Sequence, residues 1–212
     1  MTEATRILGN EWHLPILERI FLLLRWLLTP YTQMSQRLPI HGEIIDLGCG
    51  HGLFSIHLAK SSPERQVRGR DHDEGRIASA RSATREISNV DFEVGDLSEF
   101  NGTYNGIALI DVLHYFSKDR QEAIVAKCFH SLLPGGTLLV REIEPRKTIL
   151  YGAHCLYEWL AIKLRFTKTA STEMWIRKPE EWISLLRVCG FDVSSERANS
   201  RLFSDILFVC RK

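Results

Sequence analysis

The stretch IIDLGCGHG, residues 44–52, decides how the rest of the chain is interpreted. A short apolar run passes through Asp46, and glycine then occupies every second position, at Gly48, Gly50 and Gly52. Glycine adopts positive φ at no steric cost and lets a ligand approach the backbone closely. The stretch therefore predicts a buried strand that ends in a ligand-binding turn, although a tight strand-to-helix turn without a ligand would favour the same residues.

Short apolar runs alternate with segments of helical periodicity from residue 43 onward. We expect strands at 43–47, 66–71, 90–96, 104–113 and 137–143, and helices at 53–61, 74–87 and 120–133. This alternation with short connections predicts an α/β fold, a doubly wound parallel sheet with helices on both faces. A further amphipathic helix at 178–191 precedes two closing strands at 192–198 and 205–212, which predict an antiparallel hairpin at one sheet edge.

Composition narrows the class of protein. The 212 residues, 44% of them hydrophobic, suit one compact domain, and the net charge of +1 gives no basic surplus for nucleic acid. Five scattered cysteines without metal-ligand spacing indicate reduced thiols and no metal site. Because the N-terminus also lacks the features of a signal peptide, we expect a cytoplasmic protein.

Acidic residues at the ends of later strands indicate which class of ligand the turn would bind. A nicotinamide fingerprint would have the form G-x-G-x-x-G, but Leu53 stands where its third glycine belongs, and no Gly-Lys-Ser/Thr follows to make a P-loop. Asp71 closes the second expected strand, 19 residues after Gly52 (71 − 52), where a carboxylate can accept both hydroxyls of a ribose. Asp96 closes the third, where a carboxylate can accept from an exocyclic amine such as that of adenine. Three matched strand ends together predict a nucleoside-containing ligand.

The successive motifs IIDLGCGHG, VRGRD, VDFEVGD, IDVLHYF and LLPGGTLLVRE resemble those of the class I S-adenosylmethionine-dependent methyltransferases of the small-molecule type. The resemblance covers about residues 43–142 in the right order. It implies a Rossmann-like seven-stranded sheet, mostly parallel with an antiparallel final hairpin, and S-adenosylmethionine as the cofactor. It also implies that the regions flanking these motifs shape the substrate lid.

The same resemblance implies roles for individual residues. Asp46 and the loop of Gly48, Cys49, Gly50 and Gly52 would hold the methionine part of the cofactor. Asp71 would bind the ribose, His72 would lie against the adenine, and Asp96 and the Leu97 backbone would read the adenine edge. Asp111 and Val112 would lie below the sulfonium, on the substrate side.

Two residues are candidates for chemistry. His114 follows the fourth expected strand, and an imidazole with an ordinary pKa of ~6.5 suits a general base for a phenol or hydroxyl. Glu142 ends the fifth strand and could hold a polar group of the substrate. A half-buried packing role for His114 and a structural ion pair for Glu142 are the alternatives. The histidine makes oxygen the favoured acceptor atom, while carbon, nitrogen and a non-catalytic cofactor-binding module stay open.

The flanking segments carry the remaining expectations. We expect a helical lid at residues 1–40, the methyltransferase domain at 41–212, and a helical cap inserted at about 146–178. The segment LPILERIFLLLRWLLTP, residues 14–30, is the most apolar of the chain, and a lid, a dimer contact or a peripheral membrane contact would each cover it. Its residues favour a small apolar or aromatic substrate, free, carrier-bound or lipid-like.

Overall fold

A computed structural model of the 212-residue chain describes residues 14–145, 174–198 and 205–212. Its centre is a seven-stranded sheet in the order β3-β2-β1-β4-β5-β7-β6. Strands β1 to β5 run parallel, while β7 pairs antiparallel with both β5 and β6. The strands span Gly42–Leu47 (β1), Arg65–Asp71 (β2), Val90–Val94 (β3), Tyr104–Ile110 (β4), Leu132–Ile143 (β5), Asp192–Arg197 (β6) and Asp205–Arg211 (β7).

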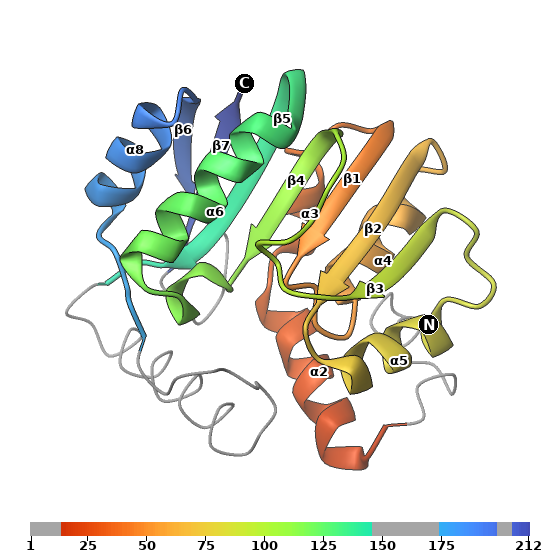
Figure 1. The fold of residues 1–212 in the computed structure, drawn as a ribbon. Coiled ribbons are helices and arrows are strands. Elements are labelled where there is room, and N and C mark those ends of the chain that lie inside the picture. The colour runs from red at the N-terminus through yellow and green to blue at the C-terminus, as the bar shows by residue number, and fades with distance from the viewer. Residues whose placement is uncertain (1–13, 146–173, 199–204) are drawn as a thin grey trace.

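Helices cover both faces of this sheet (Figure 1). Two hydrophobic clusters show the two layers, because neighbouring residues of β1 point in opposite directions: Ile44 packs with α2 to α5, and Ile45 packs with α6 and α8. The helices span Ile16–Leu28 (α2), Tyr31–Ser35 (α3), Leu53–Ser61 (α4), Glu74–Ala83 (α5), Lys118–Ser131 (α6) and Pro179–Val188 (α8), with one 3₁₀ turn at Leu113–Tyr115 (η1).

The predicted fold class is confirmed by this topology, including the antiparallel final hairpin. Three helices, α5, α6 and α8, end earlier than the sequence indicates. Helix α5 ends at Ala83, where the Thr84 hydroxyl bonds back to the carbonyl of Ala80. Helix α6 ends at Ser131, because Leu132 already pairs with Tyr104 of β4. The cap predicted at 146–178 lies almost wholly outside the described residues.

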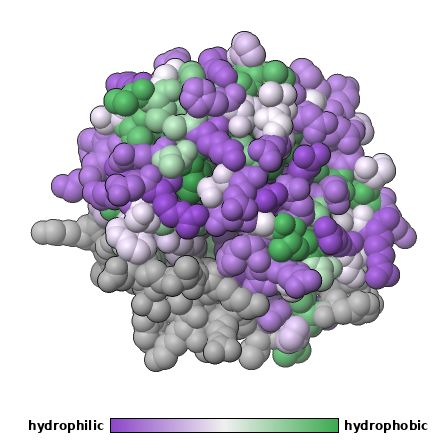
Figure 2. All heavy atoms as spheres, viewed as in Figure 1, coloured by the Kyte–Doolittle hydropathy of each residue, from purple (hydrophilic) through white to green (hydrophobic). Residues whose placement is uncertain are grey.

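Helix α2 lies at the sheet edge toward which β1 and β2 point (Figure 1). One side of α2 buries Phe21 and Leu22, and the other exposes four apolar side chains, Ile16, Ile20, Leu24 and Leu27. None of the described helices is both long and apolar enough to cross a membrane. On the face drawn in Figure 2, hydrophobic side chains are scattered among hydrophilic ones.

Candidate active site at the carboxyl ends of the strands

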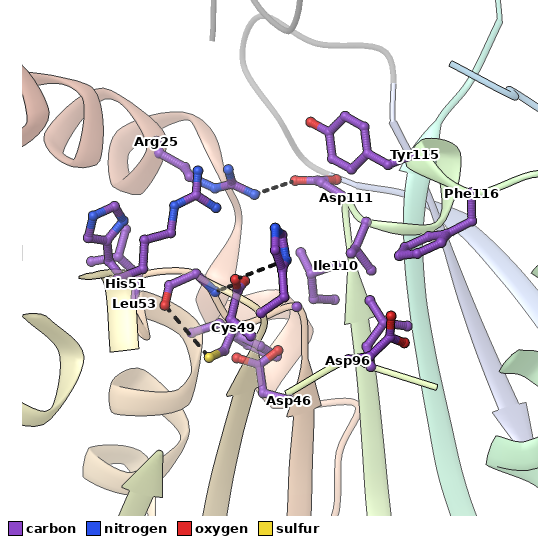
Figure 3. A pocket seen from close by; sticks show the side chains of 18 of the residues that line it. Arg25, Asp46, Cys49, His51, Leu53, Asp96, Ile110, Asp111, Tyr115 and Phe116 are labelled. Atoms are coloured by element: carbon purple, nitrogen blue, oxygen red, sulfur yellow. Dashed lines mark hydrogen bonds and ion pairs between the residues drawn. The ribbon is translucent and has the colours of Figure 1, made fainter. Parts of the chain in front are cut away.

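One pocket of about 610 Å³ opens beyond the carboxyl ends of β1, β2 and β4, where ligands bind in open α/β sheets. Figure 3 shows side chains from the glycine loop, from α2 and from the end of β4 converging on it. Ten of the eleven residues predicted to hold the cofactor line this pocket: Asp46, Gly48, Cys49, Gly50, Asp71, His72, Asp96, Leu97, Asp111 and Val112. The eleventh, Gly52, is buried behind the loop.

The three loop glycines serve different ends, although all have positive φ. A Cβ on Gly48 would lie 2.6 Å from the side chain of Val112, and one on Gly52 would lie 2.6 Å from the ring of Phe92. A Cβ on Gly50 would meet nothing within 4 Å. Gly48 and Gly52 therefore let the loop pack against its neighbours, and Gly50 is the one that borders open space in the pocket.

Asp71 ties the glycine loop to the second strand. One carboxylate oxygen of Asp71 accepts the backbone N–H of Gly50 at 2.9 Å, and the other accepts the N–H of Asp73 at 2.9 Å. The backbone N–H groups of Gly48 and Cys49 meanwhile donate to the carbonyl of Arg70. The acid at the end of β2 thus fixes the loop at the end of β1 from inside the pocket.

Asp46 is a buried carboxylate beneath the loop, and it accepts a hydrogen bond of 2.6 Å from the Ser55 hydroxyl. Burial raises the pKa of Asp46 to about 6, helped by the negative charge of Asp71 and opposed by the Ser55 hydrogen bond. A positive group bound nearby would stabilise the charged form of Asp46.

Asp96 lies at the far end of the pocket and is partly exposed. It accepts hydrogen bonds from the backbone and hydroxyl of Ser98 and from the guanidinium of Arg120. Burial alone would raise the pKa of Asp96, but these hydrogen bonds outweigh it and lower the pKa. Arg120 also stacks over the Phe116 ring at 4.9 Å, so this end of the pocket has an aromatic and a charged wall.

Asp111 follows β4 and is the one described non-glycine residue with positive φ, at 54°. Its carboxylate bonds to the buried guanidinium of Arg141, which also bonds to Asp205 at the start of β7. Arg25 of α2 reaches the same carboxylate from across the pocket, with 3.5 Å between Nη2 and Oδ2 (Figure 3). The end of β4 is therefore held by charges from three separate elements.

Comparisons with known proteins agree with this geometry. A protein-family model described as a methyltransferase domain matches residues 44–136. The chain is 29% identical over 101 residues to a trans-aconitate 2-methyltransferase of Deinococcus radiodurans, a match that covers 48% of this chain and 38% of that protein. It is 27% identical over 105 residues to a 2-heptyl-1-hydroxyquinolin-4(1H)-one methyltransferase of Mycobacteroides abscessus, covering 48% of this chain and 46% of that protein.

The fold is similar to that of magnesium protoporphyrin IX methyltransferase from Synechocystis PCC 6803, solved with bound S-adenosylmethionine. The TM-score is 0.67 at 17% identity, over 98% of this chain and 88% of that one. The chain carries a class I S-adenosylmethionine-dependent methyltransferase domain. The match to this family decides against the nicotinamide interpretation of the loop. The chain spans less than half the length of the curated relatives it matches.

The structure does not place the two predicted catalytic residues of this methyltransferase domain on the pocket. His114 and Glu142 are both buried and do not line it. The Nδ1 atom of His114 lies 2.7 Å from one carboxylate oxygen of Glu142, and the other oxygen accepts the N–H of Leu113 at 2.8 Å. The expectation that these groups face the substrate is therefore not met, and their geometry is that of a pair that holds η1 against β5.

Sequence reasoning missed several residues on the substrate side of the methyltransferase pocket. Arg25 had a visible signal, because it is a lone charge within the apolar run FLLLRWLL. The aromatic lining had none, since it comes from elements far apart in the chain. These missed residues are Tyr31, Phe54, Tyr115 and Phe116, whereas Phe21 and Leu22 lie in the predicted lid segment and Trp175 in the predicted cap. Among the described residues, no group of three His, Cys, Asp or Glu side chains could hold a metal ion.

The raised pKa of Asp46 gives a testable pH dependence. Ionisation of Asp46 is disfavoured in the folded domain, so its contribution to the free energy of unfolding falls as pH rises from about 4 to about 6. A shift from 3.8 to about 6 corresponds to a loss on the order of 3 kcal/mol. Part of this loss has occurred by pH 4.5, so we expect wild type to lose about 2 kcal/mol of stability relative to Asp46→Asn between pH 4.5 and pH 7.5, measured by urea unfolding of both proteins. A constant difference across that range would contradict the prediction.

Proposed function

We propose that this protein transfers the methyl group of S-adenosylmethionine to an oxygen atom of a small acceptor with an apolar or aromatic body. The observation that carries the proposal is the set of residues that line the pocket at the carboxyl ends of the strands. It joins ten residues predicted to hold the cofactor to a wall of aromatic and aliphatic side chains contributed by α2, α3, α4 and η1. A methyl donor and an apolar acceptor would meet there.

The polar groups present fit this cofactor. Gly50 leaves open space at the loop, where the methionine part would lie against backbone. Asp46, a buried carboxylate with a pKa raised to about 6, suits a nearby ammonium group. Asp71 and Asp96 would accept from the ribose hydroxyls and the adenine amine, with His72 and Leu97 beside them. The loop needs no phosphate-binding lysine, because this cofactor has no phosphate.

S-adenosylmethionine supplies a methyl group already activated by its positive sulfur. The domain then has to hold acceptor and donor in line and keep water out. Asp111 and Val112, at the end of β4, would place the acceptor on the far side of the methyl group. Phe21 and Leu22 of α2 lie on the pocket wall, which supports the interpretation of this helix as a lid over that pocket.

The preference for oxygen as the acceptor atom cannot be based on His114, because His114 does not line the pocket. Oxygen stays the favoured atom because an acceptor that is already ionised, such as a carboxylate or an acidic hydroxyl, needs no general base. The relatives support this class, since one is named for trans-aconitate and another for a hydroxyquinolinone. Small free acceptors are therefore the first to be tested.

Two measurements test the proposal. Calorimetry with S-adenosylhomocysteine and, separately, with NAD shows which nucleotide the protein binds. Release of S-adenosylhomocysteine from S-adenosylmethionine is then followed with a panel of aromatic and aliphatic carboxylic acids and phenols. We expect binding of S-adenosylhomocysteine and turnover of at least one acid or phenol. Binding without any turnover would favour a non-catalytic module, and no binding would remove the proposal.

A further inference from the structure

Arg25 is a cation in a wall of the pocket that is otherwise apolar. One turn earlier on α2 lie the buried side chains of Phe21 and Leu22. Phe21, Leu22 and Arg25 all line the pocket. Residues four apart on a helix share one face, so Phe21 and Arg25 point the same way. The side chain of Arg25 is 28% exposed, against 2% for Arg141, so the pocket can reach its guanidinium.

The charges around Asp111 leave Arg25 able to serve a second anion. Asp111 is already paired with the buried guanidinium of Arg141, which also bonds to Asp205, so it does not depend on Arg25 alone, whose Nη2 lies 3.5 Å from its Oδ2. The contact from Arg25 to Asp111 is longer than the contact from Arg141. A guanidinium has five N–H donors in a planar fork, so one Arg25 can hold Asp111 and another carboxylate together.

The electrostatic effect on His51 shows that Arg25 acts on this part of the pocket. His51 lines the pocket, and its pKa is lowered to about 3 by burial first and then by the positive charges of Arg76 and Arg25. Asp73 opposes this lowering of the pKa. Glu18 faces the same imidazole, with 3.9 Å between Oε2 and Nε2. The positive charge of Arg25 therefore reaches the pocket lining on the side of the glycine loop as well as at Asp111.

We propose that Arg25 anchors an anionic group, of the carboxylate class, on the acceptor. This inference rests on the proposed function and gives the acceptor two parts: an aromatic or aliphatic body against Phe21 and Phe54, and a carboxylate on Arg25. The methionine carboxylate of the cofactor has the same chemistry. Arg25 also lies near His51 of the loop that would hold methionine, and it is assigned to the acceptor because its ion pair is with Asp111, which follows β4 beside Tyr115 (Figure 3).

The test uses the full-length protein saturated with S-adenosylhomocysteine and a panel of aromatic and aliphatic carboxylic acids, each paired with its uncharged primary amide. Affinities are measured by calorimetry for wild type, Arg25→Met, Arg25→Lys and Arg19→Met. Arg19 is on the same helix but does not line the pocket, so it is the matched control. Far-UV circular dichroism confirms that each variant is folded.

We expect wild type to bind at least one acid about ten- to a hundredfold more tightly than its amide, the scale of a charge-assisted hydrogen bond. Arg25→Met should lose that preference while its affinity for S-adenosylhomocysteine stays within about twofold. Arg25→Lys should keep part of the preference for the acid over its amide, and Arg19→Met should keep all of that preference.

Three results would overturn the inference. One is equal binding of acids and amides by wild type, or binding of neither, and another is a preference that survives in Arg25→Met. The third is a matching loss of S-adenosylhomocysteine affinity in Arg25→Met, which would assign Arg25 to the methionine carboxylate. Failure of wild type to bind S-adenosylhomocysteine would instead remove the proposed function itself, so the two failures are distinct.

Discussion

Replacing Arg141 with leucine is expected to lower the free energy of unfolding by about 3–5 kcal/mol. The guanidinium of Arg141 is buried between the carboxylates of Asp111 and Asp205, which are themselves buried. Burial alone would lower the pKa of Arg141, but the two carboxylates outweigh it and raise the pKa, so the group stays charged. Without that charge, two carboxylates would lie in the interior with too little compensation. Urea unfolding followed by circular dichroism at pH 7.5 measures the change.

Two further variants separate this ion-pair effect from simple loss of a side chain. Arg187→Leu removes an exposed arginine of α8 and should change the free energy of unfolding by no more than about 0.5 kcal/mol. Arg141→Leu combined with Asp205→Asn removes one of the orphaned charges and should recover part of the loss. A loss for Arg141→Leu as small as that for Arg187→Leu would mean that the buried network does not hold β4, β5 and β7 together.

The elements of this fold were predictable because their signals are local. Helix α4 begins directly after the glycine loop and ends at Ser61, as the apolar pattern and the following Ser-Ser-Pro predict. Asp71 and Asp96 were predictable for the same reason, since Asp71 ends β2, Asp96 comes shortly after β3, and parallel strands end at a common edge. The cofactor side of the pocket is therefore a product of strand ends, which the sequence displays.

The substrate side was less predictable because its contacts join distant segments. Nothing in the sequence around Arg141 shows that its guanidinium forms an ion pair with Asp205, which lies 64 residues later (205 − 141). Successive residues of a strand face opposite sides of the sheet, so Arg141 and Glu142 cannot both serve the same site. Arg141 bonds to Asp111 on the pocket wall, and Glu142 turns to His114 in the interior. The histidine was misplaced because its position after β4 does not fix the direction of its side chain.

Replacing Asp71 with alanine is expected to weaken the binding of S-adenosylhomocysteine by about 1.5–3 kcal/mol, the scale of a lost hydrogen bond to a charged group. This corresponds to roughly ten- to 150-fold in Kd. The structure adds a second reason to the proposed contact with ribose. The carboxylate of Asp71 also holds the N–H groups of Gly50 and Asp73, each at 2.9 Å, so its loss frees the loop that faces the cofactor. Calorimetry at fixed pH and salt measures the affinity.

Variants at the same and at a distant position tell these two effects apart. Asp71→Asn keeps an amide oxygen that can accept from Gly50 but lacks the charge, so an intermediate loss would show that loop and ribose both depend on the carboxylate. Asp119→Ala removes an exposed acid in the first turn of α6 and should leave the affinity unchanged. If Asp71→Ala bound S-adenosylhomocysteine as tightly as Asp119→Ala, the ribose could not lie at the end of β2. The glycine loop would then keep its shape through Gly48 and Gly52, whose packing against Val112 and Phe92 does not involve Asp71.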